Sequence, residues 1–233
     1  MPQGSCLGPL LFTIYVSKLF EVVKTCVPIA HAYADDSQLY LSFQPDNELS
    51  ETQAITSMER CIKAVRASML KDKLKLNEEK TEFLVMGIRQ QLDKVSLDEM
   101  TIGYTKVKTT TSARSLGVWF DHNMQLHTNI PKMYAMVRIY LYNIRRIRKH
   151  LTYELTRALT RATIIAPLDY CNSLLYGCSD GQIKILQRLQ NMAARLLCNS
   201  TRFCRIMPLL SKLHWLPVKL RTKYKMLLNA YKV

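Results

Sequence analysis

The chain has 233 residues, 48% of them hydrophobic, which is enough apolar material for one large domain or two small ones. Its seven cysteines are odd in number and none shows the Cys-x-x-Cys spacing of structural zinc sites, so buried free thiols are expected, Cys171 and Cys178 among them. No stretch has the apolar length and charge pattern of a signal peptide or a membrane span. We therefore expect an intracellular protein, nuclear or cytoplasmic, that is not secreted.

The net charge of +15 is carried entirely by the C-terminal half. Residues 1–120 contain 14 Lys and Arg against 14 Asp and Glu, whereas residues 121–233 contain 19 against 4. Such an asymmetry suggests a neutral half beside a basic half that meets a polyanion. Nucleic acid is the first candidate and an anionic membrane the second.

The first predicted elements are a buried or half-buried helix over residues 7–23 and a hairpin. Two strands, 29–34 and 37–43, are separated only by Asp35 and Asp36, which is hairpin spacing. Adjacent carboxylates repel each other by about 1 kcal/mol at about 4 Å in water, and a divalent cation would reverse that sign. Tight turns favour Asn-Gly or Asp-Gly, so folding alone would not select Asp-Asp.

The next segments predict an amphipathic helix and more strands. Residues 46–70 have helical spacing, with Asn47 or Ser50 as the N-cap. A short strand is expected at 83–86, and residues 101–108 and 115–120 are expected to pair as a further hairpin. This order fits a small antiparallel sheet with helices on one face, ending near residue 121.

After residue 121 the strand signals stop. Helices are expected at 133–147, 153–165, 182–197 and 218–231, broken by Pro167, Pro208 and Pro217. Most tyrosines of this half have helical spacing and are expected in the core, with stacking on nucleic-acid bases as the alternative. The fold class is therefore α+β, with domains at 1–121 and 122–233.

Several segments occur in an order that carries more information than any one of them. In the first half these are Pro2-Gln3-Gly4-Ser5, Tyr33-Ala34-Asp35-Asp36, Asn77-Glu78-Glu79-Lys80 and Leu116-Gly117-Val118-Trp119. Together they resemble the reverse transcriptases of LINE-type (non-LTR) retrotransposons. Residues 168–177 and 213–218 are similar to segments that follow the thumb in the jockey-like and chicken-repeat-like groups.

The resemblance implies a partial polymerase palm followed by an all-helical, basic thumb and post-thumb region. It implies RNA template, DNA primer and deoxynucleoside triphosphates as partners, and no membrane. It assigns Mg²⁺ binding and catalysis to Asp35 and Asp36, with Lys80 near the triphosphate. The implied nucleotide and template contacts are Gln3, Gly4, Ser5 and Tyr33, and the implied primer grip is Leu116, Gly117, Val118 and Trp119.

The family pattern also includes a third catalytic carboxylate, on a strand upstream of the Pro-Gln-Gly-Ser segment, and basic fingers residues further upstream. The first residues of this chain already belong to the Pro-Gln-Gly-Ser segment. We therefore expect this fragment to be inactive in isolation and to bind Mg²⁺ weakly or not at all. The alternatives are a non-catalytic, basic nucleic-acid-binding module and a decayed gene fragment without a selected function.

Two groups of charged residues can each be interpreted in two ways. Arg145, Arg146, Arg148 and Lys149 are expected to contact the nucleic-acid backbone, because the half that contains them is strongly basic. They would also suit a solvated helix end, which the helix dipole favours for cations. Lys80 would suit a solvated charge before a strand.

Overall fold

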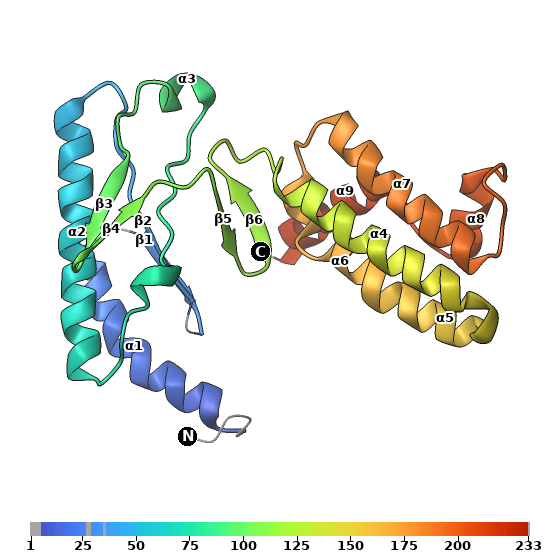
Figure 1. The fold of residues 1–233 in the computed structure, drawn as a ribbon, viewed down its shortest axis with the longest axis horizontal. Helices are drawn as coiled ribbons and strands as arrows, with labels where there is room; N and C mark the ends of the chain where they lie inside the picture. Colours follow the sequence, from blue (N-terminus) through green and yellow to red (C-terminus); the bar gives the residue numbers. More distant parts are fainter. Residues whose placement is uncertain (1–5, 27–28, 35, 233) are drawn as a thin grey trace. The chain divides into compact units, whose positions relative to one another are not determined.

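The computed structural model describes residues 6–26, 29–34 and 36–232. The chain divides into two compact units, Met1–Met124 and Gln125–Val233, and the sequence predicts a boundary near residue 121. Figure 1 shows the two units as a mixed helix and strand part and an all-helical part. Each unit is described by itself.

The helices of the first unit begin and end close to where the sequence predicts. They are α1 (Gly8–Cys26), α2 (Glu48–Lys71) and the short α3 (Arg89–Leu92), with a 3-10 turn η1 (Glu78–Lys80). Asn47 caps α2, because its side-chain oxygen accepts hydrogen bonds from the amides of Leu49 and Ser50 at 3.0 and 3.3 Å. The expected helices at 7–23 and 46–70 are thus confirmed, and α3 had no signal in the sequence.

The strands of the described residues form three separate antiparallel hairpins instead of one sheet. They are β1 (Ile29–Tyr33) with β2 (Asp36–Tyr40), β3 (Glu99–Ile102) with β4 (Thr105–Lys108), and β5 (Ser112–Ser115) with β6 (Val118–Asp121). The predicted pairing of 101–108 with 115–120 is wrong, since each segment belongs to its own hairpin. Gly103 and Gly117, with φ of 65° and 85°, allow the chain to reverse within each one.

The predicted strand at 83–86 is also wrong. Only Phe83 forms a bridge, an isolated parallel one to Thr109. Its backbone oxygen accepts a hydrogen bond from the amide of Thr110 at 2.8 Å, which holds the segment beside the chain that leads into β5. A single bridge secures the position of this segment without continuing into a ladder.

Helix α2 contributes to two hydrophobic clusters of the first unit. Val23, Cys61 and Val65 form one cluster, against which Ala30 and Leu39 of the β1/β2 hairpin pack. The small side chain of Ala30 allows the strand to approach the helices, as the alanine-rich face of this strand suggests. The second cluster contains Ile62 of α2 with Met100 and Ile102 of β3. One helix therefore supports both hairpins.

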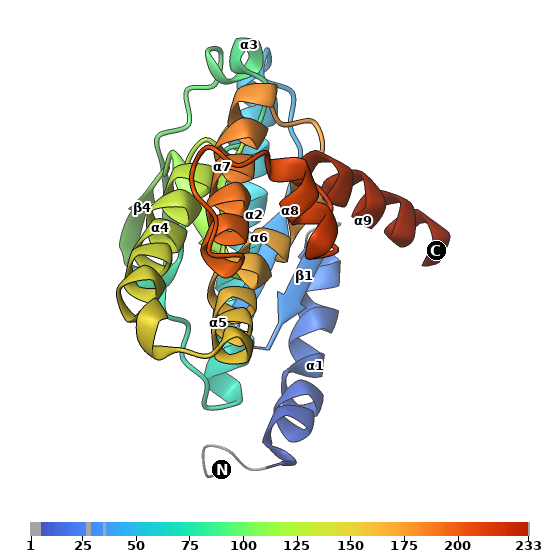
Figure 2. The ribbon, with the colours of Figure 1, turned by 90° about the vertical axis from the view of Figure 1, so that its right-hand side faces the viewer.

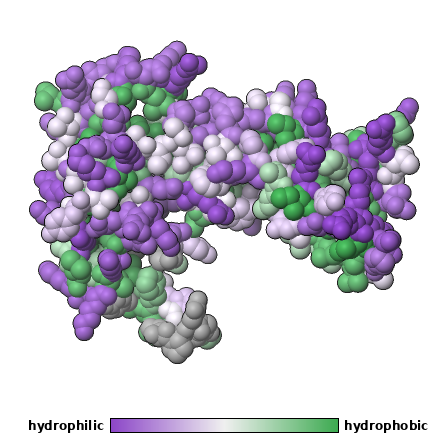
Figure 3. Space-filling view, viewed as in Figure 1, coloured by the Kyte–Doolittle hydropathy of each residue, from purple (hydrophilic) through white to green (hydrophobic). Residues whose placement is uncertain are grey.

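The N-terminal half of α1 is more exposed than a buried helix would be. Figure 3 shows apolar surface over this helix, where Leu10 and Ile14 are 59% and 60% exposed. The C-terminal half is covered instead, with Val23 buried.

No helix within the described ranges has the length and apolar composition needed to cross a membrane.

The second unit contains helices and no strand among its described residues. Figure 2 shows α4, α5 and α7 running beside one another. The α-helices are α4 (Asn129–Ile147), α5 (Tyr153–Thr160), α6 (Ala166–Asp169), α7 (Asp180–Leu197), α8 (Ile206–Lys212) and α9 (Val218–Lys232). Shorter turns are η2 (Arg148–His150), the π-helical η3 (Arg161–Ile165) and η4 (Asn172–Leu175).

The core of this unit consists of aliphatic side chains at helical spacing. Its fully enclosed members come from α4, η3, α7 and α8: Ile130, Val137, Ile164, Leu186, Leu189, Leu197 and Leu210. Ser179 begins α7 with a capping box, in which its side chain and that of Gln182 each accept a hydrogen bond from the other residue's backbone amide. The four predicted helices of this half are confirmed.

The expected helix breaks at two prolines are wrong. The chain continues from α5 through the π turn η3 into α6, which ends at Asp169, beyond Pro167. Pro208 lies in the first turn of α8, where a missing amide hydrogen costs no helical bond, and Pro167 directly follows the π turn η3 in the continuous helix.

The expected burial of tyrosines and cysteines also needs correction. Cys171 is exposed in a turn at φ 50°, and Cys178 is half-buried. Aliphatic residues fill the core, which leaves the larger phenol rings on the surface. The exposed tyrosines of the second unit are Tyr140, Tyr142, Tyr153, Tyr170, Tyr176, Tyr224 and Tyr231.

Candidate functional site

The β1/β2 hairpin carries the predicted metal-binding position. Tyr33 pairs with Asp36, so Asp36 belongs to strand β2 and is not a turn residue. The predicted turn is therefore wrong by one residue. The observed register places Leu39 opposite Ala30, and both side chains pack against the hydrophobic cluster of α1 and α2. The burial of this pair fixes the register of the hairpin. Ala34 accommodates the turn with φ of 53°.

Some predicted site residues lie outside the described residues. They are Asp35 and the predicted nucleotide contacts Gln3, Gly4 and Ser5. The structure thus describes one of the two predicted metal ligands, Asp36, and one of the four predicted nucleotide contacts, Tyr33.

Asp36 lies on the face of the hairpin that the helices leave open. Residues opposite each other in an antiparallel pair share a face, and successive residues alternate. Ala30 and Leu39 occupy the face that packs on α1 and α2, so Tyr33 and Asp36 occupy the other. Tyr33 is 70% exposed, and the Asp36 carboxylate makes no ion pair with another described residue. Its oxygens are available to a ligand.

Asp36 supplies a donor of the type that suits magnesium. A carboxylate oxygen is the ligand type that Mg²⁺ prefers, and Mg²⁺ is commonly held by one or two carboxylates with waters and substrate phosphates. Within the part of the chain that the structure describes, no three His, Cys, Asp or Glu side chains come together. Asp36 therefore fits a metal that substrate phosphates help to hold.

The β5/β6 hairpin, which contains the predicted primer grip, is linked to the Asp36 strand. Gln38 Nε2 donates a hydrogen bond to Ser115 Oγ, and the hydroxyl of Tyr40 donates to Gln38 Oε1. Gln38 is two residues from Asp36 and shares its face. The link therefore brings the turn at Leu116 next to the strand that carries the candidate metal ligand.

The turn of β5/β6 consists of Leu116 and Gly117. Their φ values, 46° and 85°, are both positive, as the tightest hairpin turns require. Leu116 is 44% exposed, whereas Val118 is only 5% exposed and Trp119 is half-buried. Of the four predicted primer-grip residues, Leu116 and Gly117 at the turn are thus the accessible ones.

The segment that contains Lys80 is tied by its neighbours to β5, to β4 and to α2. Glu82 Oε2 accepts a hydrogen bond from the amide of Arg114 at 3.1 Å, one residue before Ser115. Glu78 pairs with Arg66 at 3.1 Å and accepts from Thr105 Oγ1 at 2.9 Å. Lys80 itself is exposed. Three segments that are distant in sequence, around residues 36, 80 and 116, are therefore tied together through polar contacts.

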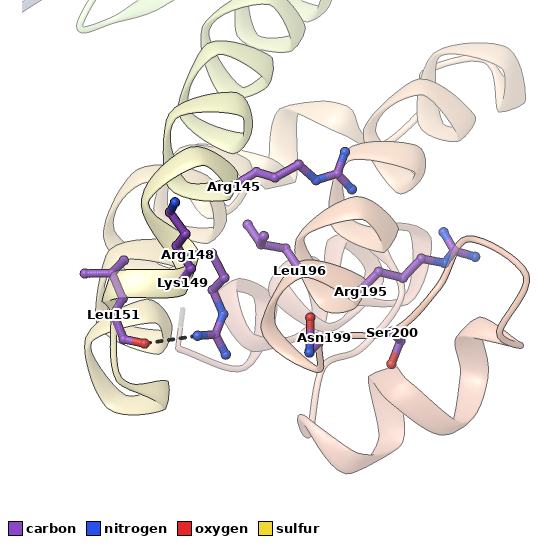
Figure 4. A pocket seen from close by; sticks show the side chains of 8 residues that line it. All are labelled: Arg145, Arg148, Lys149, Leu151, Arg195, Leu196, Asn199 and Ser200. Carbon is purple, nitrogen blue, oxygen red and sulfur yellow. Dashed lines mark hydrogen bonds between the residues drawn. The ribbon is translucent and has the colours of Figure 1, made fainter.

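The second unit separates the four predicted backbone-binding cations. Arg145, Arg148 and Lys149 line a cavity of about 430 Å³, whereas Arg146 is not part of its lining. The guanidinium carbon of Arg146 lies 5.8 Å from the ring centroid of Tyr142 instead. Figure 4 shows that Arg195 of α7 joins the cavity lining, so a second helix supplies a cation.

Sequence reasoning missed several of these residues. Gln38 lies in a predicted strand, but it shares the face of Asp36 only because Asp36 also belongs to that strand, which the predicted turn did not allow. Ser115 and Glu82 had no comparable signal, since their partners lie 77 and 32 positions away in the chain. Arg195 had none either, because the other cations of its cavity belong to a different helix. Long-range contacts of this kind are set by packing and not by local spacing.

Comparisons with known proteins address the first unit. A family model, described as reverse transcriptase (RNA-dependent DNA polymerase), matches residues 1–120, which is more than half of the chain. Neither the curated proteins nor the solved structures returned a match. The matched residues include both hairpins and the Lys80 segment, and proteins of this family bind nucleic acid. The chain belongs to the reverse transcriptase family.

Proposed function

We propose that the first unit is part of the palm of a non-LTR-type reverse transcriptase, which adds deoxynucleotides to a DNA primer on an RNA template. The observation that supports this best is the open face on which Asp36 lies, with the Leu116 turn linked to it through Gln38 and Ser115. A nucleotidyl-transfer site needs carboxylates that are reachable by triphosphate and primer together. In this proposal, the second unit is the thumb and post-thumb region.

The residues of the hairpins have separate roles in this proposal. Asp36, with Asp35, would hold Mg²⁺, which when bound neutralises triphosphate charge and favours ionisation of the primer 3′-hydroxyl. The exposed ring of Tyr33 lies on the same face and would contact the nucleotide. Lys80 would approach the triphosphate, and the Leu116 turn would contact the primer backbone.

The number of carboxylates limits what these residues do by themselves. The family mechanism uses three, and the two hairpin aspartates supply two. We expect the 233-residue chain alone to give no primer extension with Mg²⁺ and an RNA template. A product that appears with this chain and disappears in Asp36→Asn would overturn the expected inactivity and would support the assignment of Asp36.

Metal binding tests the assignment without relying on activity. Mn²⁺ can replace Mg²⁺ at oxygen sites and is observed directly by electron paramagnetic resonance. In the presence of a deoxynucleoside triphosphate, Asp36→Asn should reduce the protein-bound Mn²⁺, whereas Asp93→Asn, a matched change at an exposed carboxylate, should not. Protein-bound Mn²⁺ that is detected in the unchanged chain and is equally strong in both variants would contradict the metal role of Asp36.

A second function, nucleic-acid binding without catalysis, is favoured by the charge of the second unit. Residues 125–233 contain 19 Lys and Arg against three acidic residues, Glu154, Asp169 and Asp180. Such a surface binds phosphate backbones with an affinity whose logarithm falls by about 0.7 to 0.9 per phosphate contact for each log unit of salt. Binding that does not change between about 50 and 200 mM salt would exclude this function.

A further inference from the structure

The cavity of the second unit has a lining rich in unpaired cations. It lies between the last turn of α4 with η2 on one side and the last turn of α7 on the other (Figure 4). Arg145, Arg148, Lys149 and Arg195 line it together with Asn199 and Ser200. Of the described residues, none forms an ion pair with these four cations. Positive charges are thus gathered without a counterion.

Two of the guanidinium groups have a buried donor without an acceptor. Arg148 Nη1 donates to the backbone oxygen of Leu151 at 3.1 Å, and Arg195 Nη2 donates to that of Cys204 at 3.4 Å. The Nε atoms of the same two residues are buried and have no hydrogen-bond partner among the described residues. Buried donors in native proteins nearly always have an acceptor. Both residues line the cavity, so an anion bound there would face guanidinium groups whose hydrogen-bonding capacity is not fully used.

The acidic residues of this unit do not neutralise the cavity. Asp169 pairs with Arg221 at 2.7 Å and Asp180 with Lys219 at 2.9 Å, and no carboxylate belongs to the lining. The negative ends of α4 and α7 favour nearby cations. That effect does not explain why cations from two helices line one cavity, or why two of their buried donors lack acceptors.

An exposed aromatic side chain lies on the loop that follows α7, which a residue of the cavity lining contacts. Phe203 is 81% exposed, and the guanidinium carbon of Arg202 lies 4.8 Å from its ring centroid. The bond from Arg195 to Cys204 holds this loop next to the cavity lining. An apolar ring left open to water beside a basic cavity is what a nucleic-acid base can stack on.

We propose that this cavity binds a backbone phosphate of single-stranded nucleic acid and that Phe203 stacks on a nearby base. Basic grooves with adjacent aromatic rings bind single strands in this way, whereas the bases of a duplex are already stacked on each other. The site lies beyond the residues that match the reverse transcriptase model. It uses neither the Asp36 hairpin nor a metal, so it is independent of the proposed polymerase function; it rests on the second proposed function, nucleic-acid binding by this unit, for which it names the site and the form of nucleic acid.

The experiment measures anisotropy of labelled oligo(dT) and oligo(rU) of about 20 nucleotides, longer than one typical binding site, with the full 233-residue chain and no divalent ion. Arg145→Gln with Lys149→Gln should weaken binding by about 10-fold and reduce the salt slope by about 0.7 for each phosphate that is no longer bound. The control is Arg138→Gln with Lys184→Gln, which removes equal charge from exposed positions of α4 and α7 outside the lining. The control should weaken binding by about 3-fold or less, because it removes only the contribution of general electrostatic attraction to the strand.

The stacking part has its own variants. Phe203→Ser should weaken single-strand binding by about 10-fold, within the range for one stacked base, and Phe203→Tyr should retain it. Duplex binding should not respond to either change. Asp36→Asn should also bind as the unchanged chain does, so a failed polymerase assignment would leave this result intact.

Three outcomes would overturn the proposal. Equal weakening in the cavity and control double variants would mean that diffuse charge binds the strand. An unchanged affinity in Phe203→Ser would remove the stacking contact. Inorganic pyrophosphate that binds with dependence on Arg145 and Lys149, while the oligonucleotides bind without it, would make the cavity a site for free polyphosphate.

Discussion

The two units of this protein place their charged residues in opposite ways. In the first unit the candidate site is a short hairpin, and polar contacts between distant segments hold its neighbours in place, such as Gln38 with Ser115 and Glu82 with Arg114. In the second unit an aliphatic core aligns long helices, and the cations meet where two helices end. A site on hairpins thus depends on individual hydrogen bonds, whereas a site on packed helices depends on the core.

The largest expected effect comes from a substitution in the core of the second unit, on which the arrangement of its helices depends. Leu189 of α7 is fully buried, so Leu189→Ala should lower the free energy of unfolding of this unit by about 2 to 5 kcal/mol. The chain has two tryptophans, Trp119 in the first unit and Trp215 in the second. Urea unfolding followed by fluorescence in a Trp119→Phe background therefore reports on the second unit alone. The exposed neighbour Arg188→Ala should change stability by less than about 0.5 kcal/mol.

The next prediction compares equivalent helix caps in the two units. Asn47→Ala removes the cap of α2, and Ser179→Ala removes the capping box of α7. Each should cost about 1 kcal/mol, because one or two amides of the first turn lose their acceptor. Unfolding measured by Trp119 emission should shift only in the first variant and that of Trp215 only in the second. A shift of both signals in either variant would mean that the units unfold together.

A smaller gain of stability is expected in a hairpin of the first unit. Leu116 has a positive φ, and Leu116→Asn would create Asn-Gly, the pair that tight hairpin turns prefer. The variant should raise the free energy of unfolding by about 1 kcal/mol, as relief of left-handed strain predicts. Leu116→Ala keeps the strain and should show no gain. A gain of equal size in the alanine variant would point to the exposed leucine side chain and not to the backbone.

The smallest expected effect is a pH dependence in the second unit. The hydrogen bond from Lys219, with the charge of that residue, holds the pKa of Asp180 below its ordinary value. Because the folded state has the lower pKa, the contribution is present above the unfolded pKa and is lost as the pH falls through the folded one. Thermal unfolding between about pH 2 and 6 should therefore show a slightly weaker acid dependence in Asp180→Asn. An unchanged profile would show that this exposed pair contributes nothing measurable.

Local spacing made most helices predictable. The helix periods of α1, α2, α4, α7 and α9 follow from apolar residues at intervals of three and four, and caps such as Asn47 and Ser179 mark where helices begin. Proline was a poorer guide. A helix tolerates it in its first turn, as at Pro208 in α8, and Pro167 follows the π turn at residues 161–165 without ending the helix.

The hairpins were less predictable, because two questions about them are tertiary. The register at Tyr33 and Asp36 depends on which pair the helices bury, and a slip of one residue changes every face. The partner of β5 depends on the tight turn at Leu116, which pairs β5 with β6 and not with a more distant strand. The sequence near Gly117 allows that turn but does not exclude longer pairings.

By itself, the sequence determined the α+β class, the basic second half and the position of Asp36 on a hairpin, because each depends on composition or on residues close together in the chain. The segments that resemble reverse transcriptases were also found from the sequence alone, because each consists of consecutive residues. The tertiary structure decided that Asp36 lies on the open face, that Gln38 links it to the Leu116 hairpin, and that Arg195 joins Arg145 and Arg148 around one cavity. These depend on which surfaces are buried together, and burial is a property of the whole packed unit.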